Sequence, residues 1–138
     1  YVARFKKAYF RDRCIVGYHI RSWNGNKWHI CEQSLSRHNT YHNIERFYKK
    51  IVLDILRGYT PFICSDSDAI IKSLSQTFNI ITNSYNLDED CHILSKTQRD
   101  FIDILLLSKC DKFIGSFLST FSELVYYFSD SIKEVVIL

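Results

Sequence analysis

The feature that most constrains the fold is an alternation of short, β-branched apolar runs with longer amphipathic runs. In the longer runs, apolar residues recur at three- and four-residue steps, which is the period of a helix with one buried face. The shorter runs have the length and composition of buried strands. Strands are predicted at 15–20, 61–64, 79–82, 112–115 and 134–137, and helices at 41–57, 69–78, 97–108 and 119–128.

This alternation predicts an α/β fold in which helices cover both faces of a doubly wound parallel sheet. Right-handed crossovers limit the possible topologies, and the common strand order is 3-2-1-4-5. The first and fourth strands are then neighbours, and ligands bind beyond the carboxyl ends of the strands where the chain reverses direction. The sequence has 138 residues without an internal repeat or linker, so we expect a single domain, 1–138.

The composition fits a packed domain with a small anionic ligand. Apolar residues make up 46% of the chain and aromatic residues 15%, which is enough to form a core. The net charge of +3 suits a phosphate-bearing ligand but is too small and scattered for a nucleic-acid surface. No apolar run approaches the ~20 residues that span a bilayer. Because the sequence starts at Tyr1 and contains no methionine, we expect that an N-terminal part is missing.

Cysteine usage indicates a reducing compartment. The chain contains five cysteines without Cys-x-x-Cys spacing, namely Cys14, Cys31, Cys64, Cys91 and Cys110. Cys14, Cys64 and Cys110 lie in or beside apolar runs, so we expect reduced core residues there. This favours a cytoplasmic location, and the secretory pathway is the alternative if a signal or anchor precedes the chain. No His/Cys pair has the spacing of zinc ligands, so no metal site is expected.

Polar side chains converge where the predicted sheet changes direction. They are His19 and Arg21 at the end of the first strand, Asp66 at the end of the second, and Ser116, Ser119 and Thr120 between the fourth strand and its helix. Arg21 offers a fork of donors that matches phosphate oxygens. Ser119 and Thr120 open a helix whose free N–H groups and dipole favour an anion. An arginine that faces a helix N-terminus predicts a phosphate-binding crevice.

Each of these residues also has a purely structural interpretation. His19 fits a hydrogen-bonded core residue as well as a ligand contact, and Arg21 fits an ion pair with a nearby carboxylate. Asp66 fits a helix cap, and Ser119 fits an N-cap that is compatible with phosphate binding. Asp103 lies on an apolar helix, where it either faces solvent or points into the crevice and accepts N–H bonds from a base such as guanine.

Three common nucleotide and hydrolase motifs are missing. The first strand is followed by Ile-Arg-Ser-Trp at 20–23 rather than by Gly-x-Gly-x-x-Gly, which disfavours a dinucleotide cofactor. The sequence also lacks the P-loop lysine motif and the Gly-x-Ser-x-Gly nucleophile elbow.

Three ordered segments resemble the GDP-fucose-using superfamily of α1,6-fucosyltransferases, NodZ-type enzymes and protein O-fucosyltransferases. The first segment, 16–21, is similar to the family's strand that ends in His-x-Arg. The second, 62–68, is similar to its strand and Ser/Thr-Asp turn. The third and most specific, 101–121, matches an Asp, a leucine-rich helix, Ser-x-x-Asp, a strand and a Ser-Thr-Phe turn. Together the segments span about 100 residues.

The resemblance implies a Rossmann-like domain that forms the C-terminal, donor-binding half of a GT-B glycosyltransferase. It implies that Arg21 binds the β-phosphate and stabilises the departing GDP, and that His19 and Asp103 contact guanine or ribose. It further implies that Ser119, Thr120 and nearby amides hold the phosphates. The family inverts at the anomeric carbon and needs no metal in the donor site, and the resemblance adds no cofactor beyond the GDP-sugar donor.

The resemblance predicts an inverting, fucosyltransferase-like enzyme that moves a sugar from a GDP donor to a glycan or protein hydroxyl. Two family positions differ, because Ser22 replaces a second arginine and Leu118 replaces a serine of the turn. Glu32 is the carboxylate of the loop in which some members carry a catalytic base. Because the resemblance covers only the donor-binding half, we expect the acceptor half to lie outside this sequence. The alternative is a non-catalytic domain that binds a nucleotide, a sugar phosphate or another protein.

Overall fold

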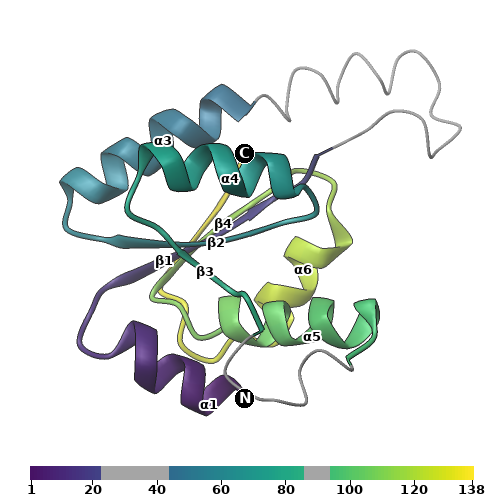
Figure 1. Ribbon diagram of the computed structural model, residues 1–138. Coiled ribbons are helices and arrows are strands. Elements are labelled where there is room, and N and C mark those ends of the chain that lie inside the picture. Colours follow the sequence, from purple (N-terminus) through teal and green to yellow (C-terminus); the bar gives the residue numbers. More distant parts are fainter. Residues whose placement is uncertain (23–43, 86–93) are drawn as a thin grey trace, which may run out of the picture.

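The computed structural model describes residues 1–22, 44–85 and 94–138, which form an α/β fold around a five-stranded sheet (Figure 1). The strands are β1 (Ile15–Ile20), β2 (Thr60–Ser65), β3 (Ile81–Thr82), β4 (Lys112–Gly115) and β5 (Glu134–Ile137). Neighbouring strands are parallel and follow the order β3-β2-β1-β4-β5, which confirms the predicted doubly wound sheet. The chain therefore reverses direction between β1 and β4.

Helices cover both faces of this sheet. They are α1 (Val2–Phe5), the π-helical turn η1 (Lys6–Phe10), α3 (Ile44–Leu56), α4 (Asp68–Thr77), α5 (Lys96–Leu107) and α6 (Thr120–Tyr127). In Figure 1, α3 and α4 lie on one face of the sheet, and α1, α5 and α6 lie on the other. The predicted elements are present, and β3 is shorter than predicted, with two residues.

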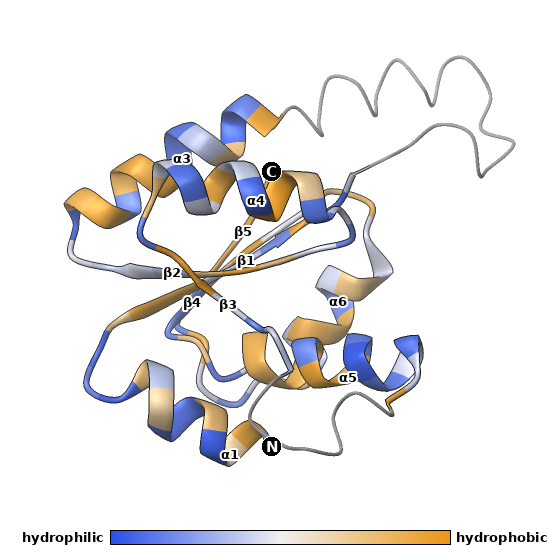
Figure 2. Cartoon of the chain, viewed as in Figure 1, coloured by the Kyte–Doolittle hydropathy of each residue, from blue (hydrophilic) through white to orange (hydrophobic). Residues whose placement is uncertain are grey.

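The central strand supplies side chains to two separate cores. All six residues of β1 are buried. Because side chains alternate along a strand, one set faces α3 and α4 and the other faces α1, α5 and α6. The first set comprises Val16, Tyr18 and Ile20. Figure 2 shows the hydrophobic strands between the inward faces of the helices. Burial on both faces explains why the β1 sequence is a continuous apolar run.

Glycine at position 17 lets α5 approach the sheet closely. A Cβ atom on Gly17 would lie 2.9 Å from both the Sγ atom of Cys110 and the Cδ2 atom of Leu107. Real Cβ atoms do not pack at that distance, so a larger side chain would push the end of α5 away from β1. This contact fixes the helix that carries Asp103.

The N-terminal helical segment was not predicted from the sequence. Phe5 and Phe10 are buried, and their ring centroids lie 5.6 Å and 5.3 Å from that of Phe62 on β2. The two phenylalanines are five residues apart, which is the spacing of a π-helical turn rather than of an α-helical stripe. A search for three- and four-residue steps therefore misses this segment.

A buried charge network joins α3 to the sheet. Asp54 is fully buried, and its Oδ2 atom accepts a 2.6 Å hydrogen bond from the Tyr18 hydroxyl. Its Oδ1 atom lies 3.2 Å from Lys50 Nζ and 3.4 Å from Lys112 Nζ. Lys112 also pairs with Glu134 at 2.9 Å. Burial, aided by the Asp54 carboxylate, raises the pKa of Tyr18 well above its usual range. These charges are paired, as buried charges must be.

The cysteine prediction is correct at two positions and wrong at one. Cys64 and Cys110 are buried free thiols, and burial raises the pKa of both. Cys14 is exposed, because it lies in the turn before β1 rather than in the strand itself. Cys31 and Cys91 lie outside the described residues.

Candidate functional site

A cavity of about 230 Å³ lies where the carboxyl ends of β1 and β2 meet α5 and α6. It is lined by His19, Arg21, Cys64, Ser65, Asp66, Asp68, Tyr85, Lys96, Arg99, Asp100, Asp103 and Phe121. The sequence nominated four of these residues, namely His19, Arg21, Asp66 and Asp103. Their separation along the chain shows that the fold, rather than a local motif, builds this cavity.

His19 is a buried, neutral wall of the cavity. Its side chain is 4% exposed, and Nδ1 lies 2.9 Å from the Ser122 hydroxyl of α6. The imidazole stacks on Phe121, with ring centroids 4.1 Å apart and planes 14° from parallel. Burial, together with the charge of Arg21, lowers the pKa of His19 to about 3. His19 therefore presents a flat, uncharged ring at neutral pH.

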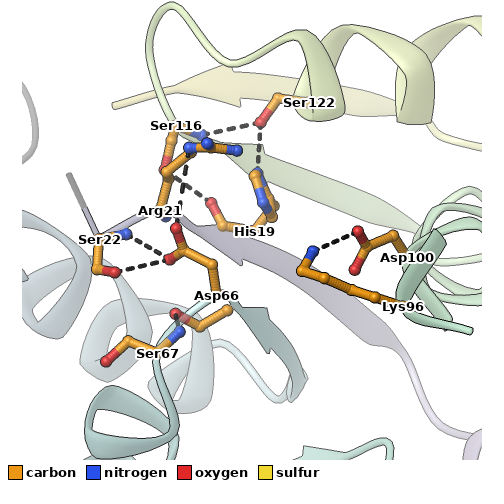
Figure 3. Close-up of polar contacts among 10 residues, drawn as sticks. His19, Arg21, Ser22, Asp66, Ser67, Lys96, Asp100, Ser116 and Ser122 are labelled. Atoms are coloured by element: carbon orange, nitrogen blue, oxygen red, sulfur yellow. Dashed lines mark hydrogen bonds and ion pairs between the residues drawn. The ribbon is translucent and has the colours of Figure 1, made fainter. Parts of the chain in front are cut away.

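Ser116 ties the end of β1 to the β4–α6 turn. Its hydroxyl donates to the His19 carbonyl oxygen at 2.9 Å and accepts the Arg21 backbone N–H at 2.9 Å. Its own backbone N–H donates to Ser122 Oγ at 3.1 Å. Figure 3 shows this group beside Arg21. The structure thus gives Ser116 a positioning role, since its hydroxyl holds the backbone from which Arg21 projects.

Arg21 and Asp66 form the polar rim of the cavity (Figure 3). The Arg21 Nε atom lies 3.9 Å from Asp66 Oδ2, and each side chain is about one-third exposed, at 33% and 32%. Asp66 Oδ1 accepts hydrogen bonds from the Ser22 backbone N–H at 2.6 Å and the Ser22 hydroxyl at 2.9 Å. A long, exposed ion pair contributes ~0–1 kcal/mol, so it orients the guanidinium without immobilising it strongly.

The helix-cap interpretation of Asp66 does not describe its contacts. The N-cap of α4 is Ser67, and no side-chain capping hydrogen bond forms there. Asp66 instead connects the β2–α4 turn to the residue that follows Arg21. The ion-pair interpretation of Arg21 holds, and it coexists with a place on the cavity wall.

Ser119 lies at the start of α6 and borders a second, more apolar cavity of about 380 Å³ that Ser116 also lines. Ser119 is the N-cap residue without a side-chain capping bond, and it is 4% exposed. Its hydroxyl has no hydrogen-bond partner within the described part of the chain. Leu118 before it adopts a left-handed backbone with φ of 55°. Thr120 is the exposed first residue of α6. The predicted residues are therefore divided between this second cavity, which Ser116 and Ser119 line, and the first cavity, whereas Thr120 lines neither.

Asp103 points into the first cavity rather than to solvent. Its Oδ1 atom accepts a 2.8 Å hydrogen bond from the Asn83 amide, and its Oδ2 atom accepts a 2.7 Å bond from the Tyr85 hydroxyl. Burial raises its pKa to about 6, although both hydrogen bonds act in the opposite direction. A pKa near 6 favours the ionised form at neutral pH, and although the Cys64 thiol also contacts the carboxylate, its oxygens keep lone-pair capacity for a ligand N–H.

Sequence reasoning missed Tyr85, Arg99 and Phe121 of the cavity wall. Tyr85 follows β3 with a left-handed backbone, φ 56°, which a sequence pattern does not reveal for tyrosine. Arg99 lies one turn before Asp103 on α5, so the helical period was a usable signal. Phe121 follows Thr120 in the matched turn, and its stacking on His19 required the folded structure.

The start of α5 also adds a charged pair to the cavity. Ser95 forms a capping box with Gln98, which begins the helix one residue earlier than predicted. Lys96 and Asp100 then pair across one turn at 2.6 Å (Figure 3). Together with Asp103 they form a polar stripe along the face of α5 that lines the cavity.

The remaining predictions concern the catalytic base, a metal site and membrane-spanning helices. Glu32 lies outside the described residues. Within residues 1–22, 44–85 and 94–138, no group of three or more His, Cys, Asp or Glu residues is arranged to hold a metal ion. Over the same ranges, no helix is both long and apolar enough to cross a membrane.

Comparison with known proteins identifies relatives in fold. No protein-family model matches the sequence, and no curated protein matches it. The structure of POFUT1 in complex with GDP has a TM-score of 0.63, with 15% identity over 99% of this chain and 44% of that chain. NodZ alpha-1,6-fucosyltransferase soaked with GDP-fucose has a TM-score of 0.60, with 15% identity over 93% of this chain and 40% of that chain. The fucosyltransferase NodZ from Bradyrhizobium has a TM-score of 0.57 at 16% identity, with the same coverage of both chains.

The chain thus spans less than half the length of the structures it resembles. The resemblance seen in three sequence segments is confirmed at the level of the fold, over nearly the whole chain. The described residues have the Rossmann-like α/β fold that forms one part of GDP-fucose-type fucosyltransferase structures.

Proposed function

We propose that this chain is the donor-binding part of an inverting, fucosyltransferase-like glycosyltransferase. The enzyme would transfer a sugar from a GDP-sugar to a hydroxyl of a glycan or protein. The observation that carries the proposal is a cavity at the carboxyl ends of the parallel strands that brings Arg21 and Asp103 together. The fold of the chain is shared with proteins whose structures were determined with GDP or GDP-fucose.

Arg21 is the proposed ligand of the donor diphosphate. The Ser116 hydroxyl and the Asp66 carboxylate orient it from two sides, so its donors are held near the strand end. Negative charge grows on the diphosphate as the bond to the sugar breaks, and a guanidinium oriented toward it stabilises that charge more than it stabilises the ground state. Ser119, Thr120 and the first amides of α6 would bind the same anion through N–H and hydroxyl donors.

Asp103 and His19 are the proposed ligands of the nucleoside. Asp103 accepts hydrogen bonds, which suits the N1–H and amino groups of guanine. His19 is neutral and stacked on Phe121, so it contributes a flat apolar surface and no positive charge. Because the phosphate ligands are a guanidinium and N–H groups, we expect donor binding without a divalent metal ion.

The proposal also includes a catalytic base and an acceptor site. We propose Glu32 as the base that removes a proton from the acceptor hydroxyl, on the strength of its place in the sequence after the His-x-Arg segment. The chain spans 40–44% of the related structures, so a further part of the protein would bind the acceptor. A non-catalytic GDP-sugar-binding domain is the second candidate, and it would bind the donor without transferring the sugar.

Substitution of Arg21 tests the proposal. Arg21→Ala removes a bidentate, charged hydrogen-bond donor, and each such bond is worth ~1.5–3 kcal/mol. We therefore expect GDP affinity to fall by about a hundredfold or more in isothermal titration calorimetry. Arg21→Lys keeps the charge without the fork and should retain part of the affinity.

The melting temperature of each variant provides the control. Arg21 is partly exposed, so neither substitution should unfold the domain. If Arg21→Ala binds GDP as the parent does, or if it unfolds, Arg21 is a structural partner of Asp66 and the proposal is wrong. Donor-dependent transfer to an acceptor, or its absence, then separates the enzyme from the binding domain.

A further inference from the structure

Arg99 lines the candidate cavity, yet contacts within the fold leave its hydrogen-bonding capacity largely unused. Its Cζ atom lies 5.6 Å from the centroid of the Tyr85 ring, a cation–π contact. Its Nε atom is buried and has no hydrogen-bond partner among the described residues. Arginine has five N–H donors and no acceptor, and an unpaired buried donor is unfavourable. A ligand with an acceptor at this position would remove that cost.

The neighbours of Arg99 indicate which kind of acceptor fits. Arg99 and Asp103 are four residues apart on α5, which places them on the same face of the helix. Tyr85 contacts both, because its ring lies near the guanidinium and its hydroxyl donates to Asp103. A fork of donors and a carboxylate with free lone pairs therefore lie side by side in one cavity. Such a pair recognises a ligand edge that carries a carbonyl oxygen beside N–H donors.

We propose that Arg99 is a specificity-determining residue that binds the 6-oxo group of a guanine base while Asp103 binds the adjacent N1–H and 2-amino groups. The inference rests on the proposed GDP-sugar function and extends it to a residue that the sequence motifs did not include. Guanine offers one acceptor next to two donors on a single edge. Adenine has an amino group in place of the oxygen, and uracil offers one donor rather than two.

Lys96 is the matched control for Arg99. It lies on the same helix three residues earlier and lines the same cavity, but its Nζ atom is paired with Asp100 at 2.6 Å. Lys96 is also highly exposed, with 84% of its side-chain surface accessible. A general loss of positive charge from the cavity would affect Lys96→Met and Arg99→Met alike, whereas a specific contact would affect Arg99→Met alone.

The test compares three nucleotides on the parent, Arg99→Met and Lys96→Met by isothermal titration calorimetry. GDP carries the full guanine edge, 6-thio-GDP replaces the 6-oxo acceptor with a weaker sulfur acceptor, and IDP lacks the 2-amino group. Methionine keeps an unbranched apolar side chain in place of the Arg99 stem but removes the cation–π contact with Tyr85, so circular dichroism and the melting temperature report whether each variant is folded. Arg99→Lys retains one donor and should recover part of any lost affinity.

We expect the parent to bind GDP about tenfold or more tightly than 6-thio-GDP. Arg99→Met should lose that preference, bind GDP about 10- to 100-fold more weakly, and still prefer GDP to IDP. Lys96→Met should keep both preferences. The inference fails if the parent does not distinguish GDP from 6-thio-GDP, or if Arg99→Met keeps the parent's ratio. A parent protein that binds no GDP at all rejects the proposed function itself, which is a separate result.

Discussion

Asp54 and Asp103 are two carboxylates withdrawn from water on opposite faces of the same sheet, and their partners differ in kind. Asp54 is fully buried and lies against two lysines, Lys50 and Lys112, as well as the Tyr18 hydroxyl. Each of its two oxygens faces a donor, and two of the three donors are charged. Asp54 is therefore enclosed by protein groups, and its interactions join α3 to β1 and β4.

Asp103 has neutral partners and an open side. Asn83 and Tyr85 donate one hydrogen bond to each oxygen, and the carboxylate faces a cavity. Without an opposing cation among its hydrogen-bond partners, burial dominates and raises its pKa to about 6. The comparison teaches that a buried carboxylate paired with cations serves the fold, whereas one held by neutral donors beside a cavity is arranged to bind a ligand.

The largest effect is expected at Asp54. Asp54→Asn leaves Lys112, which is 2% exposed, without its buried counter-charge on α3. Removing one partner of a buried ion pair costs ~3–5 kcal/mol, so we expect a loss of that size in the free energy of unfolding. Chemical denaturation measures it, and the folded fraction should bind GDP with unchanged affinity. A stability loss below about 1 kcal/mol would show that the network contributes little.

A smaller and different effect is expected from the same substitution at Asp103. Asp103→Asn keeps the shape but removes the charge and replaces one of the two acceptor oxygens proposed for the N–H groups of guanine with an NH2 donor, so GDP affinity should fall about 10- to 100-fold. The free energy of unfolding at pH 7 should not fall as it does for Asp54→Asn, because no ion pair is broken and the cost of burying the Asp103 charge is removed. Calorimetry and denaturation on the matched Asn variants measure the contrast directly. Equal destabilisation at both positions would abolish the distinction between them.

The smallest effect is a change in stability and in GDP affinity with pH that depends on the titration of Asp103. Its pKa rises from 3.8 to about 6 on folding, so its contribution to stability is greatest at low pH and falls as the pH rises from 3.8 to about 6. GDP needs the ionised form, so affinity should move in the opposite direction and weaken about tenfold from pH 7 to pH 5. Titrations at both pH values measure this change. A parent and an Asp103→Asn variant with the same pH profile would contradict the assignment.

The fold was predictable because it depends on periodic burial, and the spacing of apolar residues in the sequence reveals that period. The strand order followed from the alternation of elements and the handedness of their connections, and β1 was recognisable because it is buried on both faces. The N-terminal segment escaped because Phe5 and Phe10 use a π-helical spacing. Cys14 was misplaced because one residue at a strand boundary decides whether a thiol is buried.

Apart from Asp103, which was predicted from its place on an apolar helix and from the family resemblance, the cavity residues found from the sequence lie at the ends of strands. His19, Arg21 and Asp66 were found because the carboxyl ends of parallel strands share one edge of the sheet. Tyr85 and Arg99 were not found from the sequence. The place of Tyr85 depends on its left-handed backbone, and the place of Arg99 depends on how α5 is rotated against the sheet. The Ser116 hydroxyl bonds to the backbone of His19 and Arg21, and these bonds likewise depend on the folded turn and could not be predicted from residue spacing.

The most direct test of the central claim is nucleotide selectivity of the parent protein, measured by calorimetry with GDP and UDP under identical conditions. Both nucleotides carry the diphosphate that Arg21 would bind, so any difference between them reports on the base cavity formed by Asp103, His19 and Arg99. We predict that GDP binds and raises the melting temperature, while UDP binds much more weakly. Equal binding of the two nucleotides, or no binding of either, would contradict a GDP-sugar site in this cavity.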